Sequence, residues 1–238
     1  MTIPAIRFNQ VVKRYQKRTV LHGVELDILQ GEFFGLVGMN GAGKTTLLKC
    51  LLDFCAFDGG SIEILGRSNL LTVARQPMAF LPERFMPPYY LTGADFLKYM
   101  LRLQDLPIVP EHVDAMLTSL DLDSSVLSRP VRSYSKGMNQ KLGLAACFLT
   151  RKALYVLDEP MSGLDPKARV LLKARLQILR ETGGTLFFSS HALADVDELC
   201  DRMAILHEGQ LRFVGTPDEC RTAYAAETLE QAFMRCIS

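Results

Sequence analysis

The clearest chemistry in the sequence is a glycine-rich segment that fits the pattern G-x-x-x-x-G-K-S/T, Gly38-Met-Asn-Gly-Ala-Gly-Lys-Thr45. Such a loop binds phosphate through consecutive backbone N–H groups and the positive end of the helix that follows it. Lys44 can reach the β- and γ-phosphates of a nucleotide, and the hydroxyl of Thr45 can join a Mg²⁺ ion. The residues predicted to contact the nucleotide are Gly38, Met39, Asn40, Gly41, Ala42, Gly43, Lys44, Thr45 and Thr46.

Asp158 and Glu159 form a second candidate group, directly after the apolar run Leu154–Leu157. When a phosphate-binding loop is present, an acid at such a strand end holds Mg²⁺, and an adjacent glutamate can order and polarise the attacking water. A solvated acidic pair at a strand end is the plain alternative, and the glycine-rich loop weakens it. The two motifs together predict a site for a nucleoside triphosphate and Mg²⁺.

The identity of the base can be tested on the asparagines. Guanine-specific enzymes carry an N-K-x-D element, whereas the asparagines here are followed by Gln, Gly, Leu and Gln; they are Asn9, Asn40, Asn69 and Asn139. The sequence therefore favours ATP.

The elements that must position these residues begin with a β-rich N-terminal third. Apolar residues alternate over Ile6–Phe8 and Val24–Ile28, and a hairpin-like pair follows near Ile62–Leu65. The continuous apolar run Glu32–Val37 is typical of a buried parallel strand. It leads through the glycine-rich loop into a predicted helix over Lys44–Leu52.

The middle of the chain, from about Leu81 to Ser133, changes to helical patterning after a proline-rich loop. Thr92 is a predicted N-cap with Asp95 three residues later, and the apolar spacing over Val113–Leu120 predicts a second helix. We therefore expect a helical subdomain inserted into an α/β core.

The last part alternates strands and helices again. Strands are predicted over Ala153–Leu157 and Thr185–Phe188, a long helix opens at Asp165-Pro166 and ends at Gly183-Gly184, and a short helix covers Ala192–Cys200. This alternation predicts a mostly parallel sheet covered on both faces.

Composition excludes several classes of protein. The 238 residues are 48% hydrophobic and 22% charged, which is ordinary for a globular chain, and about 72% of the unfolded surface would be buried on folding. The net charge of +1 gives no support to broad electrostatic binding of nucleic acid or anionic lipid. The six cysteines show no metal-ligand spacing, so reduced thiols are expected. The start does not resemble a signal peptide, and no apolar run is long enough to span a bilayer.

Three further segments make a family resemblance specific. Tyr134-Ser-Lys-Gly-Met138 opens a helix before the Asp158 strand, Ser162-Gly-Leu-Asp165 follows that strand, and Ser189-Ser-His191 ends the next one. In this order the motifs resemble the nucleotide-binding domain of ATP-binding cassette (ABC) transporters, over essentially the whole chain. Tyr134–Met138 stands at the place of the family's signature sequence.

The resemblance implies an α/β fold: a P-loop NTPase core of ABC ATPase type, with an N-terminal antiparallel β subdomain and an inserted α-helical subdomain. It implies a single domain over 1–238, with the ATP-binding core in 1–82 and 151–238. The helical subdomain, including the signature helix, would cover about 83–150.

The resemblance also implies a head-to-tail dimer with a second copy or a homologous ATPase subunit. Each ATP would lie between the loop of Lys44 on one subunit and Ser135 and Gly137 on the other. Glu159 would be the general base, and His191 would contact the γ-phosphate. A plain capping role is the alternative for His191.

Tyr15 stands where the family places an aromatic residue that stacks on adenine, although a half-buried aromatic at a strand end is the alternative. Thr45 and Asp158 are the implied Mg²⁺ ligands. Glu83 replaces the family's usual glutamine, and its carboxylate can approach the ion but cannot donate a hydrogen bond. Lys136 and Met138 also depart from the signature pattern.

The leading hypothesis for function is an ATPase subunit, cytoplasmic and peripheral on the inner face of the membrane, that energises an exporter whose permease is a separate chain. Tyr134–Met138 and Leu229–Phe233 resemble bacterial subunits of this type. No nucleic-acid partner is expected. The alternative is a soluble ABC ATPase acting on nucleic acid or ribosomes, which the single cassette disfavours. A non-hydrolysing regulatory subunit is a third hypothesis, and Glu159 and His191 argue against it.

Overall fold

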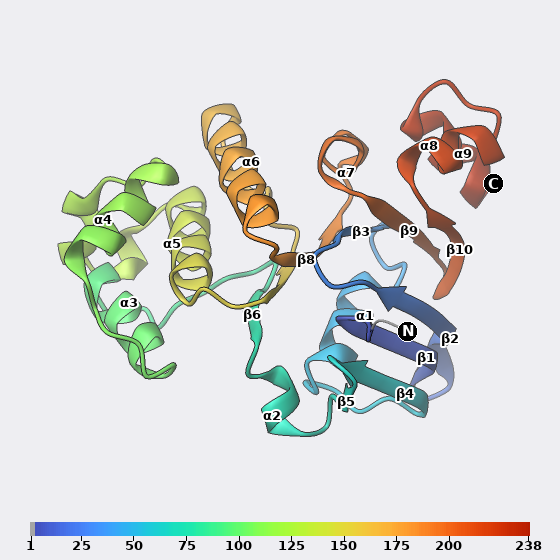
Figure 1. Cartoon of the computed structure of the whole chain (residues 1–238), viewed down its shortest axis with the longest axis horizontal. Helices are drawn as coiled ribbons and strands as arrows, with labels where there is room; N and C mark the ends of the chain where they lie inside the picture. The colour runs from blue at the N-terminus through green and yellow to red at the C-terminus, as the bar shows by residue number, and fades with distance from the viewer. Residues whose placement is uncertain (1–2) are drawn as a thin grey trace.

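The structure of the chain, a computed structural model, describes residues 3–238. Two sheets and a set of helices make up the fold (Figure 1). The N-terminal sheet is antiparallel, in the order β2-β1-β4-β5, and its strands are β1 Ile6–Tyr15, β2 Arg18–Ile28, β4 Gly59–Ile64 and β5 Arg67–Ser68. Strands β1 and β2 are longer than the alternation predicted, because β-bulges interrupt the period of two within β1.

The central sheet has the order β10-β9-β3-β8-β7-β6. Its strands are β3 Phe33–Val37, β6 Met78–Leu81, β7 Leu154–Asp158, β8 Thr185–Ser190, β9 Arg202–His207 and β10 Gln210–Gly215. All neighbouring pairs are parallel except β9 with β10. The predicted mostly parallel sheet is confirmed. Since parallel strands end at one edge, the loops after β3, β7 and β8 meet there.

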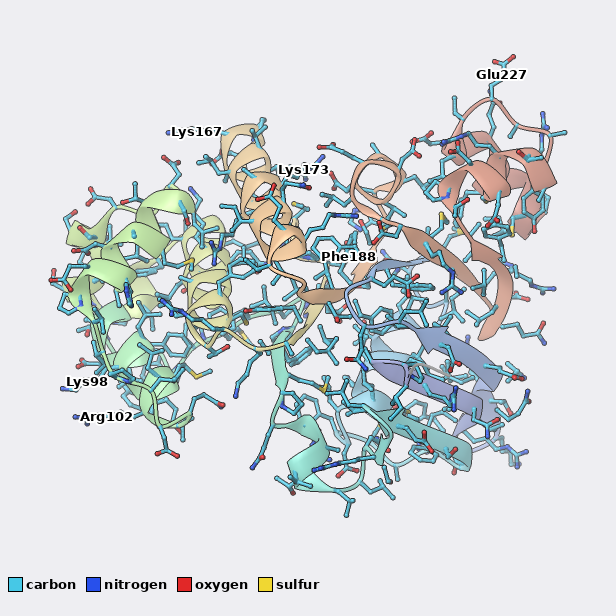
Figure 2. All side chains as sticks on the ribbon, viewed as in Figure 1. Lys98, Arg102, Lys167, Lys173, Phe188 and Glu227 are labelled. Atoms are coloured by element: carbon cyan, nitrogen blue, oxygen red, sulfur yellow. The ribbon has the colours of Figure 1, made fainter. Side chains whose placement is uncertain are left out.

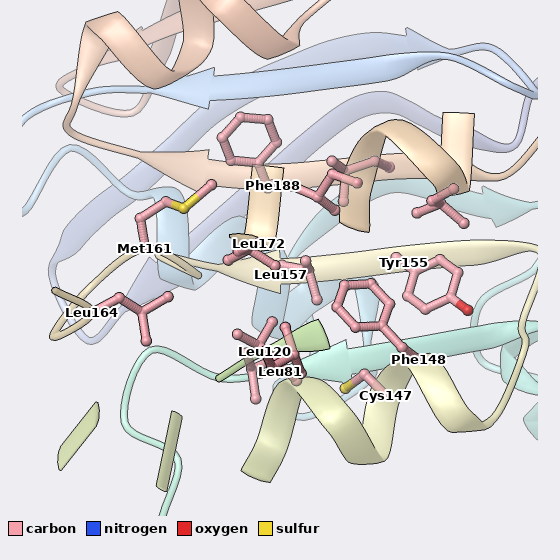
Figure 3. Packing of buried hydrophobic residues seen from close by; sticks show 14 of the residues in the cluster. Leu81, Leu120, Cys147, Phe148, Tyr155, Leu157, Met161, Leu164, Leu172 and Phe188 are labelled. Atoms are coloured by element: carbon pink, nitrogen blue, oxygen red, sulfur yellow. The ribbon is translucent and has the colours of Figure 1, made fainter. Parts of the chain in front are cut away.

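Both faces of the central sheet are buried, as the continuous apolar run in β3 predicted. Phe33 and Val37 belong to the core packed against the helices, while Phe34 and Leu36 belong to the core shared with the antiparallel sheet. On the helix side, Phe148 and other apolar side chains pack over the strands (Figure 3).

The helices are α1 Lys44–Leu51, α2 Thr72–Arg75, α3 Gly93–Arg102, α4 Pro110–Ser119, α5 Lys136–Leu149, α6 Pro166–Glu181, α7 Leu193–Leu199, α8 Pro217–Ala223 and α9 Leu229–Ile237. Helices α3, α4 and α5 lie together at the left of Figure 1. Within residues 3–238, no helix combines the length and the apolar character needed to cross a membrane.

The predicted caps are confirmed. The hydroxyl of Thr92 accepts the N–H of Asp95 at 3.1 Å and begins α3, and the carboxylate of Asp165 accepts the N–H of Ala168 at 2.9 Å and begins α6. Strands β6, β9 and β10 and helices α2, α8 and α9 were not predicted. The division into a core and a helical subdomain near 83 and 150 stays a prediction.

Candidate nucleotide site

A cavity of about 550 Å³ opens where the loops after β3, β7 and β8 meet. Most of the predicted site residues line it, namely Tyr15, Met39, Asn40, Gly41, Gly43, Lys44, Thr45, Thr46, Glu83, Asp158, Glu159 and His191. The structure therefore brings together residues from the N-terminal sheet, the glycine-rich loop and two strands of the central sheet. Gly38, Ala42, Ser135 and Gly137 are not among the residues that line the cavity.

The backbone of the glycine-rich loop requires glycine at particular positions. Gly41 and Gly43 have φ of 83° and 113°, which side chains with a Cβ rarely adopt, and Gly43 is the N-cap of α1. At Gly38 a Cβ would lie 2.4 Å from the carbonyl oxygen of Leu206 in β9. The loop consequently wraps around the start of α1, whose N-terminal N–H groups face phosphate in sites of this kind.

Lys44 holds its ammonium inside the loop. Its Nζ donates to the carbonyl oxygens of Gly38 at 2.5 Å and Met39 at 3.4 Å and lies 3.9 Å from Oε1 of Glu159. Burial lowers the pKa of Lys44, although the carboxylates of Glu159 and Asp158 act in the opposite direction. The ammonium is thus held at the cavity by backbone carbonyl oxygens of the loop and faces the carboxylate of Glu159.

Asp158 ends β7 beside the first turn of α1. Thr45 Oγ1 donates to its Oδ2 at 3.2 Å, and the buried hydroxyl of Ser189, on β8, donates to its Oδ1. Burial raises the pKa of Asp158, against the effect of these two hydrogen bonds. A hydroxyl and a carboxylate side by side are hard oxygen donors of the type Mg²⁺ takes, with phosphate oxygens and water completing its shell. The residues present therefore fit this ion.

Glu159 lies between two nitrogen-bearing side chains. Its Oε2 is 2.8 Å from Nδ1 of the largely exposed His191, and its Oε1 faces Lys44. Its backbone is left-handed, with φ of 51°, and its N–H donates to the carbonyl oxygen of Ser189 at 3.2 Å and to the hydroxyl at 3.0 Å. The buried carboxylate is therefore aimed into the cavity by a strained turn fixed to β8.

The alternative role for His191 is wrong, because Ala192 takes the N-cap position of α7 and no side chain caps that helix. Ser189, in contrast, was not predicted. It contacts both acids of the site, and only the parallel pairing of β7 with β8 brings it there.

Tyr15 ends β1 on the far side of the cavity and is about half exposed. Its hydroxyl lies 3.8 Å from Sγ of Cys55, a contact that raises the pKa of Tyr15, and Nζ of Lys13 lies 4.9 Å from the ring centroid. Arg18, the partner of Tyr15 across the β1–β2 turn, also lines the cavity but was not predicted. An exposed ring beside cationic side chains suits a heteroaromatic base.

Ser135 is the N-cap of α5, and its hydroxyl accepts the N–H of Met138 at 3.2 Å. Ser135 is exposed, and neither Ser135 nor Gly137 lines the cavity of its own chain. Their predicted contact with a nucleotide would therefore require one bound by another subunit.

The fold and the glycine-rich loop at the cavity are those of P-loop proteins of the ABC type, and comparison with known proteins agrees. The pattern of the family described as ABC transporter matches residues 21–162. The chain belongs to this family, and the predicted resemblance is confirmed.

Among curated relatives, an ABC transporter ATP-binding protein of Nostoc sp. is 40% identical over 86% of this chain and 62% of its own length. The lantibiotic transport ATP-binding protein of Streptococcus pyogenes is 33% identical, over 87% of this chain and 88% of its own. The chain spans about three fifths of the length of the first two relatives it matches.

Two solved structures share the fold. The ATP-binding subunit of an ABC transporter superposes with a TM-score of 0.89 and 28% identity, over 98% of this chain and 99% of its own. A dimeric ATP-binding cassette bound to ADP and phosphate, in a post-hydrolysis state, superposes with a TM-score of 0.81 and 21% identity, over 89% of this chain and 98% of its own. The predicted fold class is confirmed.

Proposed function

We propose that this chain binds and hydrolyses ATP and that a membrane exporter uses the energy released. The observation that carries the proposal is the contact series Lys44–Glu159–His191, set beside the Thr45–Asp158 pair in one cavity. These are the groups needed to hold a triphosphate and to order a water molecule against it.

Each group has a role that follows from its position. Lys44 exchanges the carbonyl oxygens of Gly38 and Met39 for phosphate oxygens. Thr45 and Asp158 would hold Mg²⁺, with Glu83 at the same cavity as a further candidate ligand, and the ion would neutralise charge on the phosphates. Glu159 accepts a proton from the attacking water, and His191 orients that carboxylate through the 2.8 Å contact.

The partner at the nucleotide would be a second copy of this chain or a homologous subunit. Ser135 and Gly137 lie at the exposed N-terminus of a 14-residue helix, so their hydroxyl and N–H groups can face the γ-phosphate of a nucleotide bound by the partner. Two equal sites then form across one head-to-tail interface. Since the triphosphate binds the closed state more tightly, hydrolysis releases it. A dimer among the solved structures that share the fold supports this arrangement.

The second partner would be a separate transmembrane permease, which places the chain in the cytoplasm at the inner face of the membrane. Transport is supported by the name of the Streptococcus relative, a lantibiotic transport ATP-binding protein. Export is supported by the name of a Nod factor export ATP-binding protein of Paraburkholderia xenovorans, which is 34% identical over 90% of this chain and 71% of its own. The loop between β6 and α3 suits the docking surface, because the apolar side chains of Met86, Tyr89 and Tyr90 are exposed on it. The core over 1–82 and 151–238 would hold ATP, while the helical subdomain over about 83–150 would face the permease.

Steady-state ATP turnover by the Glu159→Gln variant tests the proposal. Without the carboxylate the attacking water is not activated, so we expect turnover to fall at least about 100-fold while ATP affinity is retained. Glu63→Gln, on β4 of the antiparallel sheet, is the matched control and should leave turnover unchanged. Turnover by Glu159→Gln equal to that of the unaltered chain would exclude Glu159 as the base, and ATP that is never hydrolysed under any condition, permease included, would refute the function.

A further inference from the structure

The first turns of α5 form hydrogen bonds with the loop that follows Glu159 in the same chain. Nζ of Lys136 donates to Oγ of Ser162 at 3.2 Å, and its aliphatic stem lies over Gly163, where a Cβ would be 3.0 Å from Cε. One turn further along, the buried side chain of Gln140 donates to the carbonyl oxygen of Pro160 at 3.1 Å.

The same loop leads directly to the catalytic cavity. The N–H of Ser162 donates to the carbonyl oxygen of Glu159 at 3.0 Å, which closes the turn, and Ser162 itself lines the cavity. Gly163 has φ of 76°, a left-handed conformation that glycine adopts readily, and the loop turns there. A short path of hydrogen bonds therefore runs from Lys136 through Ser162 to Glu159.

Lys136 is a departure from the signature pattern, which has glycine at this position, and a glycine cannot make the contact. A lysine at the first position of a helix is also disfavoured by the helix dipole. The Lys136 side chain extends away from the helix N-terminus to the loop, where its ammonium donates to Ser162.

We propose that Lys136 is a positioning residue for ATP hydrolysis at the nucleotide site of its own chain. It couples the orientation of α5 to that of the Glu159–Gly163 turn, and thereby fixes the direction in which the Glu159 carboxylate points. The inference rests on the proposed function, and it assigns to the signature segment a contact within one chain in addition to the contact of Ser135 and Gly137 with the partner.

Lys136→Met keeps the stem but removes the donor, and Ser162→Ala removes the acceptor. We expect each variant to lower kcat about fivefold, the order expected for one hydrogen bond, with KM for ATP unchanged. The double variant should fall no further than either single one, because both remove the same interaction. Lys136→Arg should retain activity. The matched control is Lys98→Met, an exposed lysine at the outer edge of the same group of helices (Figure 2).

Hydrogen exchange of the Glu159–Gly163 segment gives a second readout that needs no turnover. Faster exchange in Lys136→Met and Ser162→Ala, but not in Lys98→Met, is expected. Unchanged exchange, or additive losses of kcat in the double variant, would overturn the inference. If Glu159→Gln abolishes turnover while Lys136→Met exchanges and hydrolyses normally, only this inference fails and the proposed function stands.

Discussion

At the scale of single residues, the site holds charges that the fold does not favour. Lys44 and Asp158 are both buried. Burial lowers the pKa of Lys44 and raises the pKa of Asp158, so it favours the neutral form of each side chain. The surrounding hydrogen bonds offset this cost only in part. A ligand that brings its own phosphates and cation into the cavity would offset the remainder, because it supplies the opposite charges. The burial of these two charged groups therefore lowers the free energy of unfolding of the nucleotide-free chain.

The sign of the pKa shift at Asp158 makes a prediction about stability. Its pKa in the folded chain is raised above the ordinary value of 3.8, so the unfolded chain loses this proton at a lower pH than the folded chain does. The free energy of unfolding therefore decreases as pH rises from 3.8 to the pKa of the folded chain. Asp158→Asn avoids this loss. We expect the nucleotide-free variant to unfold at a higher urea concentration than the unaltered chain at pH 7, and the difference to shrink toward pH 4.

Urea unfolding from pH 4.5 to 7.5 checks this, with Asp114→Asn on the exposed side of α4 as the control for losing one acid. A variant that is less stable at pH 7 would show that the hydrogen bonds from Thr45 and Ser189 outweigh the cost of burial.

At the scale of elements, local rules set where the helices begin. Thr92, Ser135 and Asp165 each accept a backbone N–H three residues ahead, which satisfies one of the donors left free in a first helical turn. The hydroxyl of Thr92 also donates to the carboxylate of Asp95 at 2.7 Å, so this cap is fixed from both sides. The capping residues of α3 and α5 therefore stabilise the first turns of two helices in the group beside the central sheet.

Removal of the Thr92 cap should be measurable. We expect Thr92→Ala to lower the free energy of unfolding by about 1 kcal/mol, because the N–H of Asp95 loses its acceptor. Thr92→Ser, which keeps the hydroxyl, is the matched control in chemical denaturation. Equal stability of the Ala and Ser variants would mean that water replaces the cap at no cost.

At the scale of the whole molecule, most of the candidate site residues lie at one edge of the central sheet. The loop after β3 supplies the phosphate-binding backbone, the end of β7 supplies both acids, and the end of β8 supplies His191. Ser135 and Gly137 do not line this cavity. Under the proposed function, each chain would carry two parts of a nucleotide site, and two subunits in opposite orientation would complete it.

Mass in solution tests this arrangement. We expect Glu159→Gln to be monomeric alone and dimeric with Mg²⁺ and ATP, because it binds the nucleotide without consuming it. Adding Ser135→Asp should abolish the dimer but leave ATP binding intact, since aspartate still caps α5 while its charge repels the partner's γ-phosphate. A dimer that survives Ser135→Asp would show that the interface lies elsewhere.

The sequence by itself determined the features that depend on neighbours along the chain. The glycine-rich loop, the acidic pair after an apolar strand, the caps at Thr92 and Asp165 and the both-face burial of Phe33–Val37 are all set by local spacing. They predicted the mostly parallel sheet, whereas the ABC fold class came from the resemblance of the motifs around Ser135, Asp165 and His191, and the roles of the site residues remain predictions. Strand β6 pairs with β7, which lies far along the chain, so no local pattern predicts that pairing. Strands β9 and β10 were missed although they pair across the short turn at Glu208-Gly209, which is a local hairpin signal.

Only the tertiary structure decided which of these features meet. Asp158 bonds with Ser189, 31 residues away, because β7 pairs with β8 in one register, and Lys136 reaches Ser162, 26 residues away, because α5 packs over that edge of the sheet. Contacts of this kind follow from the packing of whole elements, in which the loss of chain entropy is offset by apolar burial spread over the two cores rather than by any local pattern.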